Sequence, residues 1–211
     1  KSRCIPENRL LKCMRPALRW RHQKELDTME GSRVCFIGHR KIPMTDELKV
    51  NIQTAIENLI VNDKATYFLF GSRNQFDYLC HGIVSELQQK YPSIVRVACT
   101  CRSEAATMKE DKEREEEIWR TLLHKEVRIK DFDAEYEHPT KYSSGRGSYV
   151  ERNQAMIDDS DICVFYYDEN YLPLRRKNSP RDISDYQPKS GTRIAYEYAI
   201  KKEKRVINTS S

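Results

Sequence analysis

Four short stretches of the sequence place glycine and polar side chains where a ligand with negative charge would bind. Three are turns at 38–40, 71–73 and 190–192, and the fourth is Phe76-Asp77, shortly after the second turn. Glycine lets the backbone approach a ligand closely, and a helix N-terminus offers free N–H groups to an anion. Arginine adds charge-assisted hydrogen bonds to phosphate. The candidate ligand-binding residues are Gly38, His39, Arg40, Gly71, Ser72, Phe76, Asp77, Arg152, Ser190, Gly191 and Thr192, with Arg73 as a further cation.

Each of these residues also has a purely structural interpretation. Taken alone, Gly38 and Gly71 are better explained as tight turns, and His39 as a buried histidine with satisfied hydrogen bonds. Ser190 could cap a helix, and Asp77 could cap one or complement its dipole. The interpretation as an anion site therefore depends on whether these residues gather at one place in the fold.

Motifs of the common nucleotide enzymes are absent from the sequence. It contains neither a Walker sequence nor GxGxxG, so neither a standard NTPase nor a standard dinucleotide enzyme is supported, and no cofactor is expected. Among the seven cysteines, Cys99-Thr-Cys101 is a close pair without the second knuckle of a structural zinc site, so no metal is expected. Cysteines inside apolar runs suit a reducing compartment, which predicts a cytoplasmic protein.

The elements that would position the candidate residues alternate along the chain. Short apolar runs bounded by turn residues predict buried strands, whereas apolar residues at helical spacing predict helices. Strands are expected at 34–39, 66–70, 93–100, 126–132 and 161–167 and from 205 onward, and helices at 45–62, 76–87, 108–125, 148–160 and 191–204.

This alternation predicts the fold class α/β, a Rossmann-like three-layer sandwich with a mostly parallel sheet. In open sheets of this kind, ligands lie beyond the carboxyl ends of the strands. The turns at 38–40 and 71–73 follow strands, and 190–192 precedes the last helix, so all three are expected at that edge. Two long loops, 133–147 and 168–190, are expected to be functional lids or disordered.

The positive charge of the chain is concentrated at its beginning. The formal net charge is +5; residues 1–28 contain eight Lys/Arg and three Asp/Glu, and the rest of the chain carries 29 of each sign. We expect 1–30 to be a basic leader outside the core and 31–211 to be a nucleotide-binding domain. A neutral domain does not favour nucleic acid as its partner, although the leader could bind it. No apolar run reaches the ~20 residues needed to cross a bilayer, so no membrane partner is expected.

Four segments resemble, in order, the SLOG superfamily (the SMF/DprA–LOG group) and within it the YpsA-like branch. They are CFIGHR at 35–40, FLFGSRNQFD at 68–77, ERNQAMIDDSDICVFYYDE at 151–169 and SGTRIAYEYAIKKEKRVI at 190–207. The branch typically has GHR after the first strand, FD after a glycine-rich turn, an RN helix before a strand and a late GT. In the second turn Arg73 and Gln75 replace small residues and would either crowd a phosphate or grip it.

The resemblance implies a Rossmann-like domain that binds a nucleotide or a nucleotide-derived small molecule at the edge identified above. It favours a sensor or binding module over an enzyme, because the chain lacks an obvious nucleophile with its base. Relatives of this type often pair through helices, so the resemblance also implies a homodimer.

An enzyme is the alternative that the resemblance leaves open. Lonely Guy phosphoribohydrolases release a base from a nucleoside 5'-monophosphate, and their arginine is matched by Arg152, but Asn153 replaces the lysine. Where their carboxylate follows Gly-Thr by three residues, this chain has Ala195. The nearest acid, Glu197, would point about 200° away on a helix. The candidate catalytic residues are Arg152, Glu197 and Asp77.

Overall fold

The structure is a computed structural model that describes residues 18–20, 30–71, 74–102, 132–143, 145–172 and 189–210. The candidate residue Ser72 and the predicted helix at 108–125 lie outside these ranges. The predicted strand at 126–132 also lies outside them, except for its last residue.

A parallel sheet of seven strands forms the middle layer. Its order is β1-β5-β4-β3-β2-β6-β7, and every neighbouring pair is parallel. The register places Cys35, which lies on the strand between β3 and β6, between Leu69 and Cys163. The strands are β1 (Leu18–Trp20), β2 (Ser32–Gly38), β3 (Ala65–Phe70), β4 (Val95–Thr100), β5 (Ala134–Glu137), β6 (Ile162–Tyr166) and β7 (Arg205–Asn208).

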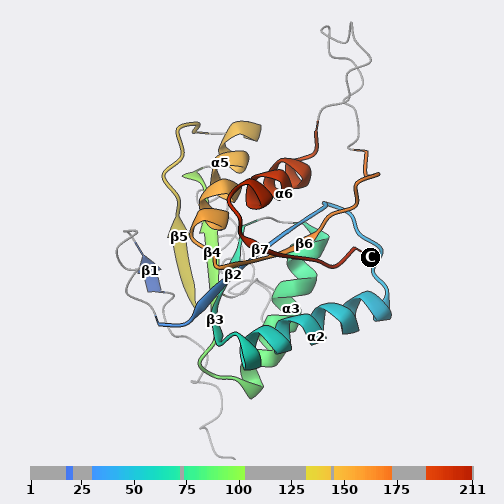
Figure 1. Ribbon diagram of the computed structural model, residues 1–211. Helices are drawn as coiled ribbons and strands as arrows, with labels where there is room; N and C mark the ends of the chain where they lie inside the picture. The colour runs from blue at the N-terminus through green and yellow to red at the C-terminus, as the bar shows by residue number, and fades with distance from the viewer. Residues whose placement is uncertain are drawn as a thin grey trace, which may run out of the picture.

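Helices cover both faces of the sheet, which confirms the predicted three-layer α/β sandwich. Figure 1 shows α2 (Asp46–Asn62) and α3 (Gln75–Lys90) on one face, with α5 (Gly145–Asp158) and α6 (Gly191–Lys201) on the other. Alternate strand residues point to the two faces, so the core divides into two apolar clusters, one on each side of the sheet. Within the described ranges, no helix has the length and apolarity to cross a membrane.

Local sequence determines where the helices begin. The hydroxyl of Thr45 accepts a hydrogen bond from the backbone of Leu48, and Ser190 caps α6 in the same way. The cap of α3 is Asn74, whose side chain accepts from the backbone N–H of Asp77 at 2.8 Å. Asp77 therefore lies in the first turn of α3, where a carboxylate complements the helix dipole, and does not cap the helix itself.

One strand lies where the sequence predicted a loop. β5 occupies the start of the predicted loop 133–147 and pairs with β4. The sequence also predicted a strand at 126–132, of which the structure describes only the last residue. At the edge of the sheet, β1 lies within the predicted leader 1–30 and pairs with β5. The division of the chain at residue 30 stays a prediction.

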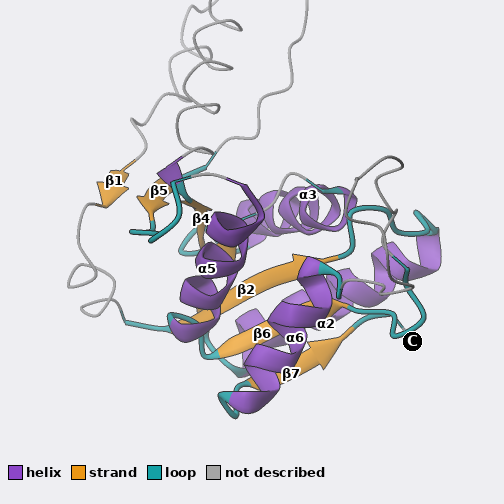
Figure 2. Ribbon diagram, turned by 90° about the horizontal axis from the view of Figure 1, so that it is seen from above, coloured by secondary structure: helices purple, strands orange, loops and turns teal. Residues whose placement is uncertain are grey.

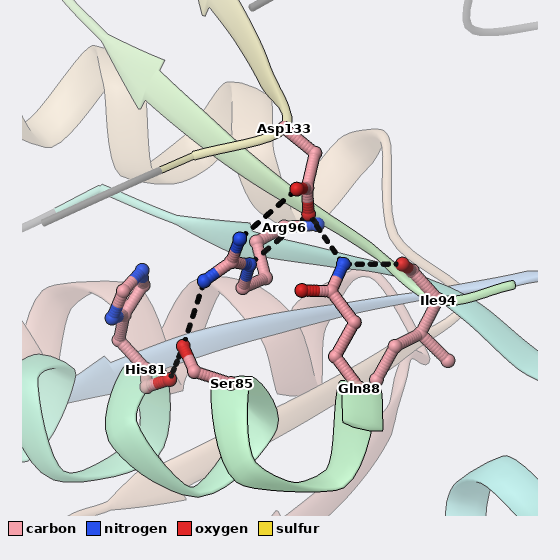
Figure 3. A network of polar contacts seen from close by, with 6 residues as sticks. All are labelled: His81, Ser85, Gln88, Ile94, Arg96 and Asp133. Carbon is pink, nitrogen blue, oxygen red and sulfur yellow. Dashed lines mark hydrogen bonds and ion pairs between the residues drawn. The ribbon is translucent and has the colours of Figure 1, made fainter. Parts of the chain in front are cut away.

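A polar network fixes the start of β5 against β4 and α3 (Figure 3). The guanidinium of Arg96 donates to both carboxylate oxygens of Asp133, at 3.0 Å from Nε and from Nη2. Gln88 of α3 donates to the same carboxylate at 2.8 Å, and Arg96 also donates to the hydroxyl of Ser85 at 2.9 Å. A short strand with few apolar residues thus gains its position from charge-assisted hydrogen bonds.

The direction of the chain reverses between β2 and β6, the fifth and sixth strands in the order of the sheet. From β2 the chain proceeds outward through β3, β4 and β5, and then returns to place β6 on the other side of β2. The carboxyl ends of β2 and β6 therefore define the topological switch point, the usual ligand site in open α/β sheets.

Candidate functional site

Direct hydrogen bonds join the turns that follow β2 and β3. The backbone N–H of Gln75 donates to the carbonyl of Arg40 at 3.2 Å, and its side-chain carbonyl accepts from Ile42 N–H at 3.0 Å. The amide of Asn74 donates to the carbonyl of Gly38 at 3.4 Å. Two of the predicted turns therefore form one connected surface at the carboxyl edge of the sheet.

His39 joins this surface to the end of β6. Its backbone N–H donates to the Tyr166 carbonyl at 3.3 Å, and its imidazole Nε2 lies 3.0 Å from the backbone N–H of Asp168. Nε2 also lies 3.2 Å from the Asp168 carbonyl, so the ring bonds to the Asp168 backbone as donor or as acceptor according to its tautomer. Burial lowers the pKa of His39, although the Asp168 backbone and charge oppose the shift, and the ring is therefore neutral at pH 7.

Side chains of the protein itself fill the space beside the two glycines. A Cβ on Gly38 would lie 2.4 Å from the ring of Phe76, which is fully buried in the core. A Cβ on Gly71 would lie 2.0 Å from Nη1 of Arg152 and 2.4 Å from Sδ of Met156. The sequence predicted that these glycines bring the backbone close to a ligand, but in the structure they make room for Phe76 and Arg152.

Arg152, a residue of α5, belongs to a buried group of charged and polar residues. It is 2% exposed, as is Asp77, and its Nη1 donates to the side chain of Asn153 at 2.6 Å. Burial raises the pKa of the Cys99 thiol well above its ordinary value, the charge of Arg152 lowers it, and Asp159 and Asp77 raise it again. Arg152, Asp159 and Asp77 therefore all lie close enough to the Cys99 thiol to change its pKa.

His138, which follows β5, lies in the same buried group. Its Nδ1 is 3.8 Å from a carboxylate oxygen of Asp159, and burial together with the charge of Arg152 lowers its pKa to about 3. The imidazole is therefore neutral at pH 7. Among the residues that the structure describes, this group contains the cation Arg152 and the two acids Asp77 and Asp159.

The third predicted turn begins α6. Ser190 is the N-cap, Gly191 is exposed and Thr192 is buried. Figures 1 and 2 both show the N-terminal end of α6 beside the carboxyl end of β2. A guanidinium N–H of Arg146, at the start of α5, donates to the carbonyl of Lys189 and ties the two helix starts together.

Glu197 faces solvent and has cationic partners of its own. Its side chain is 44% exposed and bonds to Lys189 at 2.7 and 2.9 Å and to Arg193 at 3.0 Å. Hydrogen bonds from Lys189 and Arg193 lower its pKa. Ala195, by contrast, is buried against the sheet. Glu197 was a predicted catalytic candidate, but the helical rotation places it on the outer face of α6, away from the sheet.

Several residues at this edge were not among the sequence candidates. The candidates taken from the sequence did not include residues that follow β6. In the structure, Asp168 and Tyr171 of that segment lie directly against His39. The rule that ligands lie beyond strand ends applies equally to the sequence DENY (168–171), which follows the fifth predicted strand, so that signal was present. His138 carried no such signal, because β5 itself was not predicted.

No protein-family model and no curated protein matches the sequence. A solved structure of DNA processing protein A from Helicobacter pylori, studied for its single-stranded DNA binding mode, is similar at 18% sequence identity with a TM-score of 0.49. The match covers 88% of this chain and 67% of that one. This similarity is too low to support an argument about function, so the function is argued from the geometry of the site.

Proposed function

We propose that the chain binds a nucleotide or a nucleotide derivative at the topological switch point, as a binding module of the SLOG type and its YpsA-like branch. The observation that supports this most is the direct bonding of three turns, those after β2, β3 and β6, around the buried imidazole of His39. Ligands of parallel α/β sheets bind at this position.

The chemistry of the surrounding residues suits the parts of a nucleotide. The helices α3 and α6 both begin at this edge, and helix N-termini attract phosphate. The exposed Arg40 can donate charge-assisted hydrogen bonds to it. Asp77, in the first turn of α3, is a carboxylate of the kind that accepts hydrogen bonds from ribose hydroxyls.

A thermal-shift and calorimetric titration with AMP, ADP-ribose and ribose 5-phosphate tests the proposal. A bound ligand at 100 times its dissociation constant adds about 2.7 kcal/mol to the free energy of unfolding. Asp77→Asn, which keeps the shape of the side chain, should reduce this gain. Glu86→Gln, on the exposed side of the same helix, is the matched control and should not change it. Equal stabilisation of both variants would contradict the site.

The second candidate function is hydrolysis of the N-glycosidic bond of a nucleoside monophosphate. It requires a carboxylate beside the sugar to stabilise an oxocarbenium-like state. Of the two acidic candidates, Glu197 points outward. Asp77 is therefore the carboxylate that this function would use, and Arg152 would bind the phosphate. Incubation with AMP should release no adenine if the chain is a binding module, whereas adenine release that Asp77→Asn abolishes would favour the hydrolase.

The resemblance to SLOG proteins also leads us to propose a homodimer. Sedimentation velocity at several protein concentrations measures its mass directly. A single species of 24.9 kDa would contradict it.

A further inference from the structure

A stacked pair of rings covers the switch point of the sheet. The ring of Tyr171 lies on the imidazole of His39, with centroids 3.9 Å apart and ring planes inclined by 19°. A nucleobase stacks on an aromatic side chain in the same face-to-face manner. Two further rings lie nearby. The ring centroid of Tyr167 is 5.9 Å from that of His39, and Tyr167 stacks on Tyr196 of α6 with centroids 4.4 Å apart.

Tyr171 belongs to the segment 168–172, which we call the strap. The strap starts from a fixed point, because the backbone of Tyr167 is bonded to the side chain of Asn208 at 3.0 and 2.9 Å. Beyond that point the strap turns on itself, with the N–H of Tyr171 donating to the Asp168 carbonyl at 3.2 Å. The strap can therefore swing away at Asp168 without breaking a hydrogen bond of the sheet.

His39 is incompletely bonded beneath the strap. His39 is 2% exposed, and its Nε2 is bonded to the backbone of Asp168. Among the residues that the structure describes, Nδ1 has no hydrogen-bond partner. A buried polar nitrogen without a partner lowers stability, so a polar atom of a ligand that reached Nδ1 would bind favourably.

We propose that Tyr171 occupies the position of a nucleobase in the unliganded protein, and that the base of a bound nucleotide displaces Tyr171 from His39. This inference rests on the proposed function and assigns the base subsite within it. The strap also carries the exposed carboxylates of Asp168 and Glu169, which repel a phosphate approaching the edge. The closed strap thus opposes a nucleotide both by filling the base position and by its charge.

The test compares AMP with ribose 5-phosphate, which has the same sugar phosphate but no base. Tyr171→Ala should tighten AMP binding by about tenfold, an effect at the lower end of base–aromatic stacking. Its affinity for ribose 5-phosphate should stay within about twofold of the wild type. Tyr171→Phe keeps the ring and should bind both ligands as the wild type does. Tyr149→Ala removes a tyrosine that is 42% exposed on α5 and serves as the matched control.

A second measurement follows the strap without any ligand. In Tyr171→Ala the imidazole of His39 loses its cover, so its pKa, followed by nuclear magnetic resonance, should rise toward the ordinary value of about 6.5. An unchanged pKa would overturn the covering role of Tyr171.

The outcomes separate the two proposals. If AMP binds the wild type and Tyr171→Ala equally well, or binds the variant more weakly, Tyr171 is not a stand-in for the base, although the proposed function holds. If neither protein binds AMP, ADP-ribose or ribose 5-phosphate, the proposed function fails, and the base subsite with it.

Discussion

Arg152 and Gly71 depend on each other at the residue scale. The guanidinium of Arg152 occupies the volume that any larger residue at 71 would need. Gly71→Ala should therefore destabilise the protein by about 1–3 kcal/mol, the usual cost of overpacking a core. Urea unfolding monitored by circular dichroism measures the loss.

Gly82 provides the matched control for that substitution. It lies on the exposed side of α3, and nothing lies within 4 Å of the position of its Cβ. Gly82→Ala should raise the free energy of unfolding by about 0.5–1 kcal/mol, because glycine is a poor residue within a helix. A loss of stability in Gly82→Ala as large as that in Gly71→Ala would contradict the packing argument.

His138 should make the protein less stable in mild acid. Its folded pKa of about 3 lies below the ordinary value of about 6.5, so between these values the unfolded chain binds more protons than the folded one. The free energy of unfolding should therefore fall as the pH decreases through this window, by up to about 1.4 kcal/mol per pH unit.

The substitution His138→Phe keeps a ring in place and removes this titration. The variant should show a flatter pH dependence of urea unfolding between about pH 6 and pH 4 than the wild type does. His39, whose pKa is also lowered, remains in the variant and leaves a residual slope. An identical slope in both proteins would mean that His138 is not buried as a neutral ring.

At the scale of elements, the carboxylate of Asp133 decides the position of β5. Burial raises the pKa of this carboxyl, but hydrogen bonds from Arg96 and Gln88 outweigh burial and hold the pKa below its usual range. A carboxyl with a lowered pKa stabilises the fold above its unfolded pKa of about 3.9, and that stability is lost as the pH falls through the folded pKa.

The substitution Asp133→Asn should accordingly destabilise the protein at pH 7 by about 1–2 kcal/mol, allowing for solvent screening of this half-buried pair. The difference from the wild type should shrink at a second, acidic pH, because the carboxylate of the wild type is protonated as the pH falls through its lowered folded pKa. Denaturant unfolding at the two pH values measures both effects. Glu57→Gln, which removes the partner of the exposed Lys90, should cost less.

Elements with strong local signals were predicted well from the sequence. The helix predicted at 45–62 is present as α2, with Leu48, Ile52, Ile56 and Leu59 buried, and Ser190 caps α6, which was one of its interpretations from the sequence. β5 was missed because AEYE has no buried apolar run of its own. Its place in the sheet depends on Asp133 bonding to a residue 37 positions away, which no local pattern contains.

At the scale of the whole molecule, the described turns of the site come from residues after 37. A chain that begins at residue 30 should therefore bind AMP with the affinity of the full chain, because the basic leader contributes none of those turns. Calorimetric titration of both chains is the measurement. A tenfold weaker affinity in the shorter chain would place part of the leader at the site.

The sequence by itself determined the alternation of strands and helices, the three-layer sandwich and the edge at which the polar turns gather. Those features follow from apolar periodicity and capping residues, which act over a few positions. Only the tertiary structure decided that Phe76 and Arg152 fill the space beside Gly38 and Gly71, that Glu197 faces solvent, and that Tyr171 covers His39. These contacts join residues that are mostly far apart in the chain, and they depend on how the layers pack, a property that local spacing does not encode.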